Sequence, residues 1–207
     1  MDFSTAHHIK GIRPALGIMH SLGFSATTCL QNTGIKKEQL ELANQGISLQ
    51  QELAFYRRAL MLSNDPLLGL KLGTAYRLES YGVLGYAILS AQTLGDALTI
   101  AAEFGNLSFT HFQIGFETQG EHAIIHMSKV KPFDPDLLPL YADRDFSAII
   151  FGTETALGQK IPVIEVKLIQ DGKRYRKQYE AFYGAKVHFE QERMELIFDR
   201  QILSTPM

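Results

Sequence analysis

Residues 81–98 read YGVLGYAILSAQTLGDAL, and in this stretch glycines and other small residues are interleaved with apolar ones around a single charge, Asp96. Its first half has four residues at the spacing of one helical face: Val83, Leu84, Ala87 and Ile88. Thr93 and Asp96 form the [ST]-x-x-[DE] pattern that begins a helix. The second helix has its own apolar face: Leu94, Ala97, Leu98 and Ala101. The stretch therefore predicts two short helices in succession.

The glycines of this stretch have two possible roles, which are to cradle a phosphate or to let two helices approach closely. A dinucleotide-binding loop requires G-x-G-x-x-G after a strand, and a P-loop requires a Gly-Lys-Ser/Thr ending. Neither pattern is present. We therefore expect Gly82 and Gly85 to be packing glycines between helices.

The chain before residue 107 is typical of helices. Ser25 is expected to cap a short helix, and Ser48 with Gln51 forms a capping box ahead of a longer one. Asp65-Pro66 combines a capping residue with a proline at the first helical position. Residues 1–106 are therefore predicted to form a helical region.

From residue 107 the pattern becomes mixed. Phe112, Ile114 and Phe116 alternate with polar residues, and Gly120 is predicted to turn the chain into a second strand over 121–130. Asp134-Pro135 opens a helical region that reaches Gly158 and is interrupted at Pro139. Further strands are predicted at 163–169, 186–189 and 194–198, with a helix over 175–182. The fold class is therefore α+β, with a helical region followed by a mixed region over 107–207, the two expected to form one compact unit.

Composition excludes several classes of protein. The 207 residues hold 20 Lys and Arg against 22 Asp and Glu, so the overall charge gives no reason to expect nucleic-acid binding. Cys29 is the single cysteine, and the chain does not open with a secretory signal pattern. The most apolar stretch is too short and too polar to span a bilayer. We expect a cytoplasmic protein without a membrane partner.

The sequence offers no evident catalytic or metal site. Its seven histidines lack the spacings of metal ligands, and Cys29 has no basic partner nearby in the sequence. Asp143 and Asp145 flank Arg144 in a helix, which we interpret as a solvated face. We therefore expect no catalytic residue, no metal and no cofactor, and we do not expect an enzyme.

Residues 14–42 superficially suggest a helix-turn-helix. The second helix of this segment, residues 25–33, carries no Lys or Arg to contact phosphate. A recognition helix also needs side chains that reach base edges. Packing within the fold is therefore the favoured interpretation.

Three stretches together resemble a known family. They are DPLLGLKLG at 65–73, residues 81–98, and YEAFYGAKVHFEQERMELIFDRQILSTP at 179–206. The chain resembles the N-terminal effector-binding and dimerisation region of AraC/XylS-type bacterial transcription regulators, in the arabinose-binding-like subgroup typified by ornithine-utilisation regulators. The resemblance implies a small-molecule effector and a homodimer.

The same resemblance bears on DNA binding. Such regulators continue into a basic domain with two helix-turn-helix motifs, which is absent from this chain. DNA contact is therefore expected only through that C-terminal domain. We expect the chain to be the sensing half of a longer regulator, with a natural stand-alone form as the alternative.

We expect the ligand to bind an apolar face of the predicted hairpin, closed by the helix that follows. The predicted ligand-binding residues are Phe112, Ile114, Phe116, Ile124, His126, Tyr141 and Phe146. The alternative for this face is ordinary core. A different class of function, a haem or gas sensor, would use His126 or His188 as the axial ligand.

Overall fold

The computed structural model describes residues 7–42, 46–129 and 134–207, and the chain divides into two compact units. Unit 1 comprises Met1–Tyr76 and Pro135–Ala148, and unit 2 comprises Arg77–Asp134 and Ile149–Met207. The α+β fold predicted from the sequence is confirmed. The boundary expected at residue 106 falls inside unit 2, and the assignment of 107–207 as the ligand-binding region stays a prediction.

Unit 1 is mainly helical. Its elements are β1 (His7–His8), η1 (Ile9–Gly11), α1 (Arg13–Ser21), α2 (Ala26–Leu30), η2 (Lys37–Glu41), β2 (Gly46–Ile47), α3 (Leu49–Ser63), α4 (Leu68–Gly73) and the first part of α7 (Leu138–Leu157). Strands β1 and β2 pair antiparallel. The two capping predictions are confirmed, because the Ser25 hydroxyl accepts from the Thr28 N–H and Ser48 forms a reciprocal capping box with Gln51.

Helix α4 begins later than the sequence suggests. The Asp65 carboxylate accepts a hydrogen bond from the Leu67 N–H at 2.9 Å, which makes a turn before the helix. The helix itself starts at Leu68, so Pro66 lies ahead of it and not at its first position. The prediction of an Asp65 cap with a helical Pro66 was therefore wrong by two residues.

Two glycines of α4 allow α7 to approach closely. A methyl group at Gly69 would lie 2.8 Å from the Asp143 Cβ, and one at Gly73 would overlap the Arg144 carbonyl oxygen and lie 2.7 Å from the Ser147 hydroxyl. The Ser147 hydroxyl donates to the Leu70 carbonyl at 2.7 Å across the same contact. Glycines therefore do allow two helices to pack closely in this protein, but they lie in the 65–73 stretch and not at 81–98, where we expected them.

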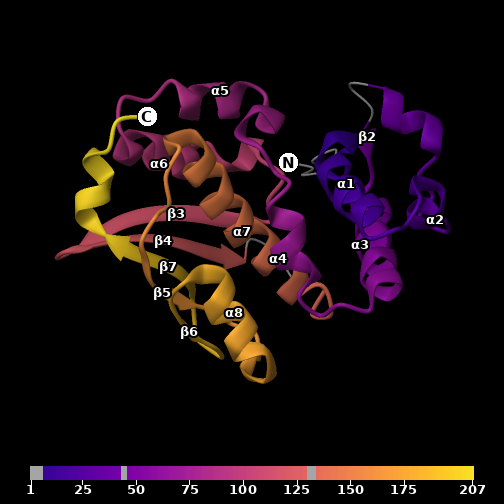
Figure 1. Cartoon of the computed structure of the whole chain (residues 1–207). Helices are drawn as coiled ribbons and strands as arrows, with labels where there is room; N and C mark the ends of the chain where they lie inside the picture. The colour runs from indigo at the N-terminus through magenta and orange to yellow at the C-terminus, as the bar shows by residue number, and fades with distance from the viewer. Residues whose placement is uncertain (1–6, 43–45, 130–133) are drawn as a thin grey trace. The chain divides into compact units, whose positions relative to one another are not determined.

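Unit 2 is built on a five-stranded sheet in the order β3-β4-β7-β5-β6 (Figure 1). Its elements are η3 (Leu78–Tyr81), α5 (Val83–Leu89), α6 (Leu94–Glu103), η4 (Gly105–Leu107), β3 (Phe112–Gln119), β4 (His122–Lys129), the rest of α7, β5 (Val163–Lys167), η5 (Lys173–Tyr175), α8 (Arg176–Tyr183), β6 (Lys186–His188), β7 (Met194–Asp199) and η6 (Arg200–Ser204). Only β5 and β6 pair in parallel among the described strands. Helix α6 packs beside β3 and α8 beside β6.

The glycines of residues 81–98 differ in role. Gly82 has φ +60° and no atom near the position of a side chain, so its role is conformational and the packing prediction for it was wrong. A side chain at Gly85 would overlap the Leu78 carbonyl. Gly85 is therefore a packing glycine, although its partner is the preceding turn η3 and not a second helix. Both predicted helices, α5 and α6, are present, and Thr93 with Asp96 forms the predicted capping box.

Helix α7 runs without a break from Leu138 to Leu157. Pro139 does not interrupt it, because it lies in the first turn, where a missing N–H removes no helical hydrogen bond. The division between the two units falls within this helix, after Ala148. Within residues 7–42, 46–129 and 134–207, no helix combines the length and the apolar character that crossing a bilayer requires.

Candidate functional site

The register of the β3–β4 hairpin decides which residues share a face of the unit 2 sheet. Gln119 pairs with His122, so Gly120 and Glu121 form a two-residue turn, with Gly120 at φ +59°. Counting back from this turn, Phe116 pairs with Ile125. Directly paired residues of antiparallel strands point to the same face.

The five predicted hairpin residues therefore do not lie together. Phe112, Ile114 and Phe116 occupy the face of Ile125, whereas the other predicted members point to the opposite face: Ile124, paired with Glu117, and His126, paired with Gly115. Our expectation of one shared face was wrong in this respect. Ile124 and Ile125 are both buried, so the apolar pattern alone does not show which of them faces the helices.

Tyr141 and Phe146, the predicted closing residues, are fully buried in unit 1, whereas the hairpin belongs to unit 2. The predicted closing residues and the hairpin therefore belong to different units. Binding of a ligand by any of the seven predicted residues stays a prediction.

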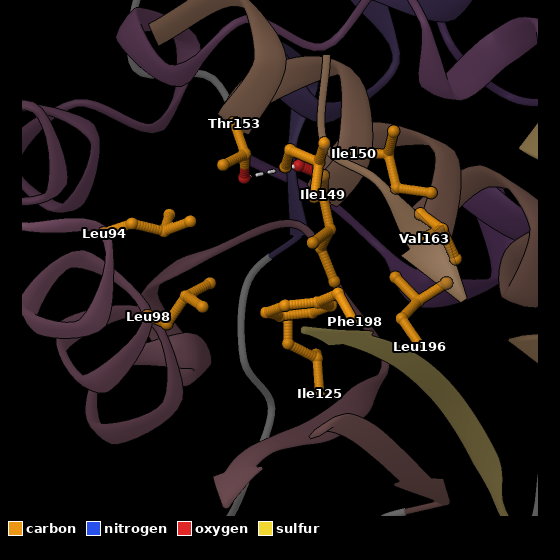
Figure 2. A pocket seen from close by; sticks show the side chains of 10 residues that line it. Leu94, Leu98, Ile125, Ile149, Ile150, Thr153, Val163, Leu196 and Phe198 are labelled. Atoms are coloured by element: carbon orange, nitrogen blue, oxygen red, sulfur yellow. Dashed lines mark hydrogen bonds between the residues drawn. The ribbon is translucent and has the colours of Figure 1, made fainter. Parts of the chain in front are cut away.

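The Ile125 face of the sheet forms one wall of an apolar cavity in unit 2 (Figure 2). The strand register brings these residues together, because Ile125 pairs with Leu196 on β7 and Val163 on β5 pairs with Phe198. Helices α6 and α7 supply the other walls. The cavity is lined by Leu94, Leu98, Ile125, Ile149, Ile150, Thr153, Ile161, Val163, Leu196 and Phe198.

The cavity lining carries one polar side chain and no titratable group. Thr153 is that residue, and its hydroxyl already donates to the Ile149 carbonyl at 2.8 Å, one turn earlier in α7. The remaining lining side chains are aliphatic or aromatic. The site can therefore accept apolar groups by burial, but it offers no charge and little hydrogen bonding to a polar ligand.

The cavity is small in this conformation. Its empty space, counted with the part that opens to solvent, is about 280 Å³, slightly below the range of about 300–1,000 Å³ for ligand pockets. The enclosed part has room for about one water-sized molecule. A larger occupant must therefore displace side chains of the lining.

The opposite face of the sheet combines the buried Ile124 and Ile197 with several charged side chains. Arg193 pairs with Glu117 at 2.8 Å and with Glu195, while Lys167 pairs with Glu195 at 2.9 Å. Burial alone would raise the pKa of Glu195, but its hydrogen bonds from Lys167 and Arg193 lower the pKa below its ordinary value. These ion pairs join strands β3, β7 and β5 across this face.

The two histidines of the haem alternative do not line the cavity. The His126 ring lies over Gly115 on the face opposite Ile125, where a side chain at position 115 would collide with it. His188 lies 3.4 Å from the Glu165 carboxylate. In the described residues, no group of three or more His, Cys, Asp and Glu side chains is arranged as ligands of a metal ion.

Unit 1 contains a buried cluster of charged side chains in α7. Asp143, Arg144 and Asp145 are 0%, 1% and 7% exposed, so the interpretation of this segment as a solvated helix face was wrong. The Arg144 guanidinium contacts the Asp145 carboxylate at 2.7 Å. Two of the residues that bury Arg144 are Tyr56 in α3 and Tyr76 just after α4; both are far away in the sequence, and no local pattern indicates them.

Three tyrosines surround the Arg144 guanidinium. Its central carbon lies 4.4 Å from the ring centre of Tyr141, 5.3 Å from that of Tyr56 and 5.6 Å from that of Tyr76, within the range of cation–π attraction. Arg144 donates to the Tyr56 hydroxyl at 3.0 Å, and the hydroxyls of Tyr56 and Tyr76 lie 2.9 Å apart. The guanidinium is thus enclosed by rings and held by hydrogen bonds.

Burial and the neighbouring side chains together determine the protonation of this cluster. Burial raises the pKa of Tyr141 well above its ordinary value, and Glu52, whose carboxylate accepts a hydrogen bond from the Tyr141 hydroxyl at 3.1 Å, adds to the rise. Burial alone would lower the pKa of Arg144, but Asp145 and the three tyrosines raise it well above its ordinary value. These directions favour a charged guanidinium beside neutral Tyr56 and Tyr141 hydroxyls, an arrangement that suits structural cohesion between α3 and α7.

Comparison with known proteins identifies a family and several relatives. Residues 23–207 match the family described as the N-terminal arabinose-binding domain of AraC transcription regulators. An ornithine utilization regulator of Pseudomonas aeruginosa is 22% identical over 193 residues, which cover 93% of this chain and 56% of that protein. An uncharacterized HTH-type transcriptional regulator of Mycobacterium tuberculosis is 24% identical over 148 residues, covering 71% of this chain and 43% of that protein. The chain thus spans about half the length of these relatives.

A solved structure has a similar fold. The crystal structure of the transcriptional regulator CdpR from Pseudomonas aeruginosa superposes with a TM-score of 0.62 at 21% sequence identity. The match covers 75% of this chain and 50% of that one. At this level of identity the similarity concerns the fold.

Proposed function

The chain belongs to the family of N-terminal arabinose-binding domains of AraC transcription regulators, and from this premise we propose that it senses a small organic effector within a longer regulator. The observation that supports the proposal most directly is the apolar cavity of unit 2. It lies between the sheet and two helices, a position in which an occupant contacts several elements at once. The effector would change gene expression and undergo no reaction.

The chemistry of the cavity favours an uncharged, largely apolar effector. The family description refers to arabinose, and one relative is an ornithine utilization regulator. A sugar needs several hydrogen-bonding partners, and ornithine carries charges whose burial without partners is costly. The single hydroxyl of Thr153 cannot satisfy either ligand. A small aromatic or aliphatic molecule fits the lining better.

The effector would act by shifting a population between two conformations. A ligand that binds one conformation more tightly moves the equilibrium toward it, and the attached half of the regulator responds to that shift. Because an occupant larger than a water molecule must displace lining side chains, the filled and empty cavities differ in structure. This difference gives the ligand unequal affinity for the two states.

Membership of this family supports a proposal for the wider assembly. The regulator would act as a homodimer in the cytoplasm and contact DNA through a C-terminal domain outside this chain. The relatives, about twice as long, have room for such a domain. The second helix of the segment at 14–42, α2, carries no Lys or Arg of its own. The described part of unit 1 therefore gives no support to a recognition helix there.

We expect Leu98→Phe to abolish binding of an apolar effector, because the added atoms fill the small cavity. The probe set is benzene, toluene and indole, with arabinose and ornithine as polar comparisons, and the measurement is the rise in melting temperature. An apolar ligand at 100 times its Kd should stabilise the chain by about 2.7 kcal/mol, and this stabilisation should be lost in the variant.

Leu107→Phe is the matched control, because Leu107 is exposed on η4 and does not line the cavity. It should keep the full response to the apolar probes. Circular dichroism establishes that both variants fold. The proposed site is wrong if arabinose or ornithine stabilises the chain and Leu98→Phe leaves that response intact.

We expect residues 1–207 alone to show no promoter-selective DNA binding at physiological salt. Specific binding requires clustered Lys and Arg that neutralise several phosphates. The densest basic run, at 173–177, covers η5 and the first two residues of α8. Two of its cations already have acidic partners: Lys173 with Glu190, and Arg176 with Glu180. An anisotropy titration with promoter and scrambled DNA measures this, and fusion to a C-terminal half of the family should restore selectivity. Tight selective binding by the chain alone would contradict its role as the sensing half.

A further inference from the structure

The C-terminal segment, residues 199–207, begins and ends beside residues that line the unit 2 cavity. It follows directly after Phe198 of β7 and continues through η6. Its last residues then return to α6, where the N–H of Leu94 donates to the Thr205 carbonyl at 2.9 Å. We call this segment the tail. The tail thus joins two sides of the cavity lining.

A small set of backbone contacts fixes the end of the tail to the start of α6. The Met207 N–H donates to the Gln92 carbonyl at 3.2 Å, and Thr93 forms an antiparallel bridge with Pro206. The backbone also approaches closely one turn earlier in the tail. A methyl group on Gly95 would lie 3.3 Å from the Leu203 carbonyl oxygen.

Leu94 belongs to the cavity and to the tail contact at once. Its side chain is 1% exposed and lines the cavity, while its backbone N–H holds Thr205. The first turn of α6 is fixed by the capping box of Thr93 and Asp96, with both hydrogen bonds at 3.2 Å. The Leu94 side chain in the cavity and the backbone contacts of the tail therefore belong to the same helical turn.

We propose that the tail is the output element of the cavity, so that an occupant which displaces Leu94 loosens the pairing of Thr205 and Met207 with the start of α6. This inference rests on the proposed function, because it takes the cavity as the effector site. Its physical basis is the limited room in the cavity, which only a water-sized molecule fills without moving the lining.

The test uses benzene as the occupant and nuclear magnetic resonance of the whole chain as the measurement. Methyl signals of Leu98 and Ile125 report whether benzene enters the cavity, and the amide exchange rates of Leu94 and Met207 report the tail. We expect benzene to accelerate exchange at both amides about three- to tenfold, the factor for losing roughly one net hydrogen bond. The Phe104 amide, bonded to Ile100 at the far end of α6, should not change.

The two readouts separate failure of the inference from failure of the proposed function. Methyl signals that do not respond to benzene or to any other apolar probe would contradict the proposed site. Methyl signals that respond while the Leu94 and Met207 amides exchange at an unchanged or slower rate would overturn the tail proposal alone.

A substitution in the tail tests the same coupling from the other side. Met207→Pro removes the N–H that donates to Gln92 and touches no cavity residue. Because coupling between two sites is reciprocal, benzene should bind this variant more tightly by the same three- to tenfold factor. Ser204→Ala is the control, because its hydroxyl bonds only within η6, to Gln201. Equal benzene affinity in Met207→Pro and the unmodified chain would contradict the coupling.

Discussion

Arg144→Met is expected to lower the free energy of unfolding by about 3–5 kcal/mol. The substitution removes the cation that faces the buried Asp145 carboxylate, and a buried charge that loses its counter-charge is strongly destabilising. It also removes the donor to the Tyr56 hydroxyl and the attraction to three tyrosine rings. Urea unfolding followed by circular dichroism measures the change.

Two further variants show whether charge burial is the cause. Arg144→Met combined with Asp145→Leu should recover most of the loss, because an apolar pair often replaces a buried ion pair at little cost. Lys71→Met removes an exposed ion pair with Asp65 and should cost less than about 1 kcal/mol. Equal losses in Arg144→Met and Lys71→Met would show that the buried cluster contributes nothing special.

Gly73→Ala is expected to destabilise unit 1 by about 1–3 kcal/mol. The new methyl group would overlap the Arg144 carbonyl oxygen in α7, and backbone atoms cannot move aside as a flexible side chain can. Alanine is a better helix former than glycine by about 1 kcal/mol. The measured loss of stability is therefore the cost of the steric clash minus this gain in helix propensity. The free energy of unfolding in urea again measures it.

Gly17→Ala is the matched control in the same unit. Gly17 lies inside α1, is exposed and has nothing near the position of the new methyl group. The same substitution should therefore stabilise the chain by about 0.5–1 kcal/mol. If both variants shift stability in the same direction, close approach between α4 and α7 is not the reason for glycine at position 73.

Local signals in the sequence predicted the elements well. Ser25, Ser48 and Thr93 cap helices as expected, because a cap depends on residues three positions away. The hairpin turn at Gly120 and the strands around it also formed where alternation indicated. These features are decided by short-range hydrogen bonding and backbone conformation, which a single sequence records.

The predictions that failed depend on distant partners. Arg144 is buried because Tyr56 and Tyr76, 88 and 68 positions earlier, enclose it. Nothing in the neighbourhood of Arg144 distinguishes this from an exposed charged helix face. Gly73 owes its role to a helix that begins 65 positions later, at Leu138. Tertiary context alone carries that information.

The sequence could have predicted which of the candidate ligand-binding residues share a face of the hairpin. With a two-residue turn at Gly120 and Glu121, two residues of the hairpin face each other when their residue numbers add up to 241. Phe116 and Ile125 are such a pair. Applying this rule selects Ile125 and Met127 in place of Ile124 and His126. The apolar wall of the cavity follows from the same register. The residues that α6 and α7 contribute to the cavity depend on tertiary packing, so the strand register does not predict them.

The path of the chain through its two units has a consequence for folding during synthesis. The chain builds part of unit 1, then part of unit 2, returns to unit 1 at Pro135–Ala148 and ends in unit 2. A nascent chain that has emerged only as far as residue 134 lacks Arg144, so Tyr56 and Tyr76 have no guanidinium to enclose. Unit 1 therefore cannot close before Pro135–Ala148 has emerged, and unit 2 cannot close before its second segment, Ile149–Met207, has been made. Contacts of such long sequence separation slow folding and lengthen the time for which apolar surface is exposed on the ribosome.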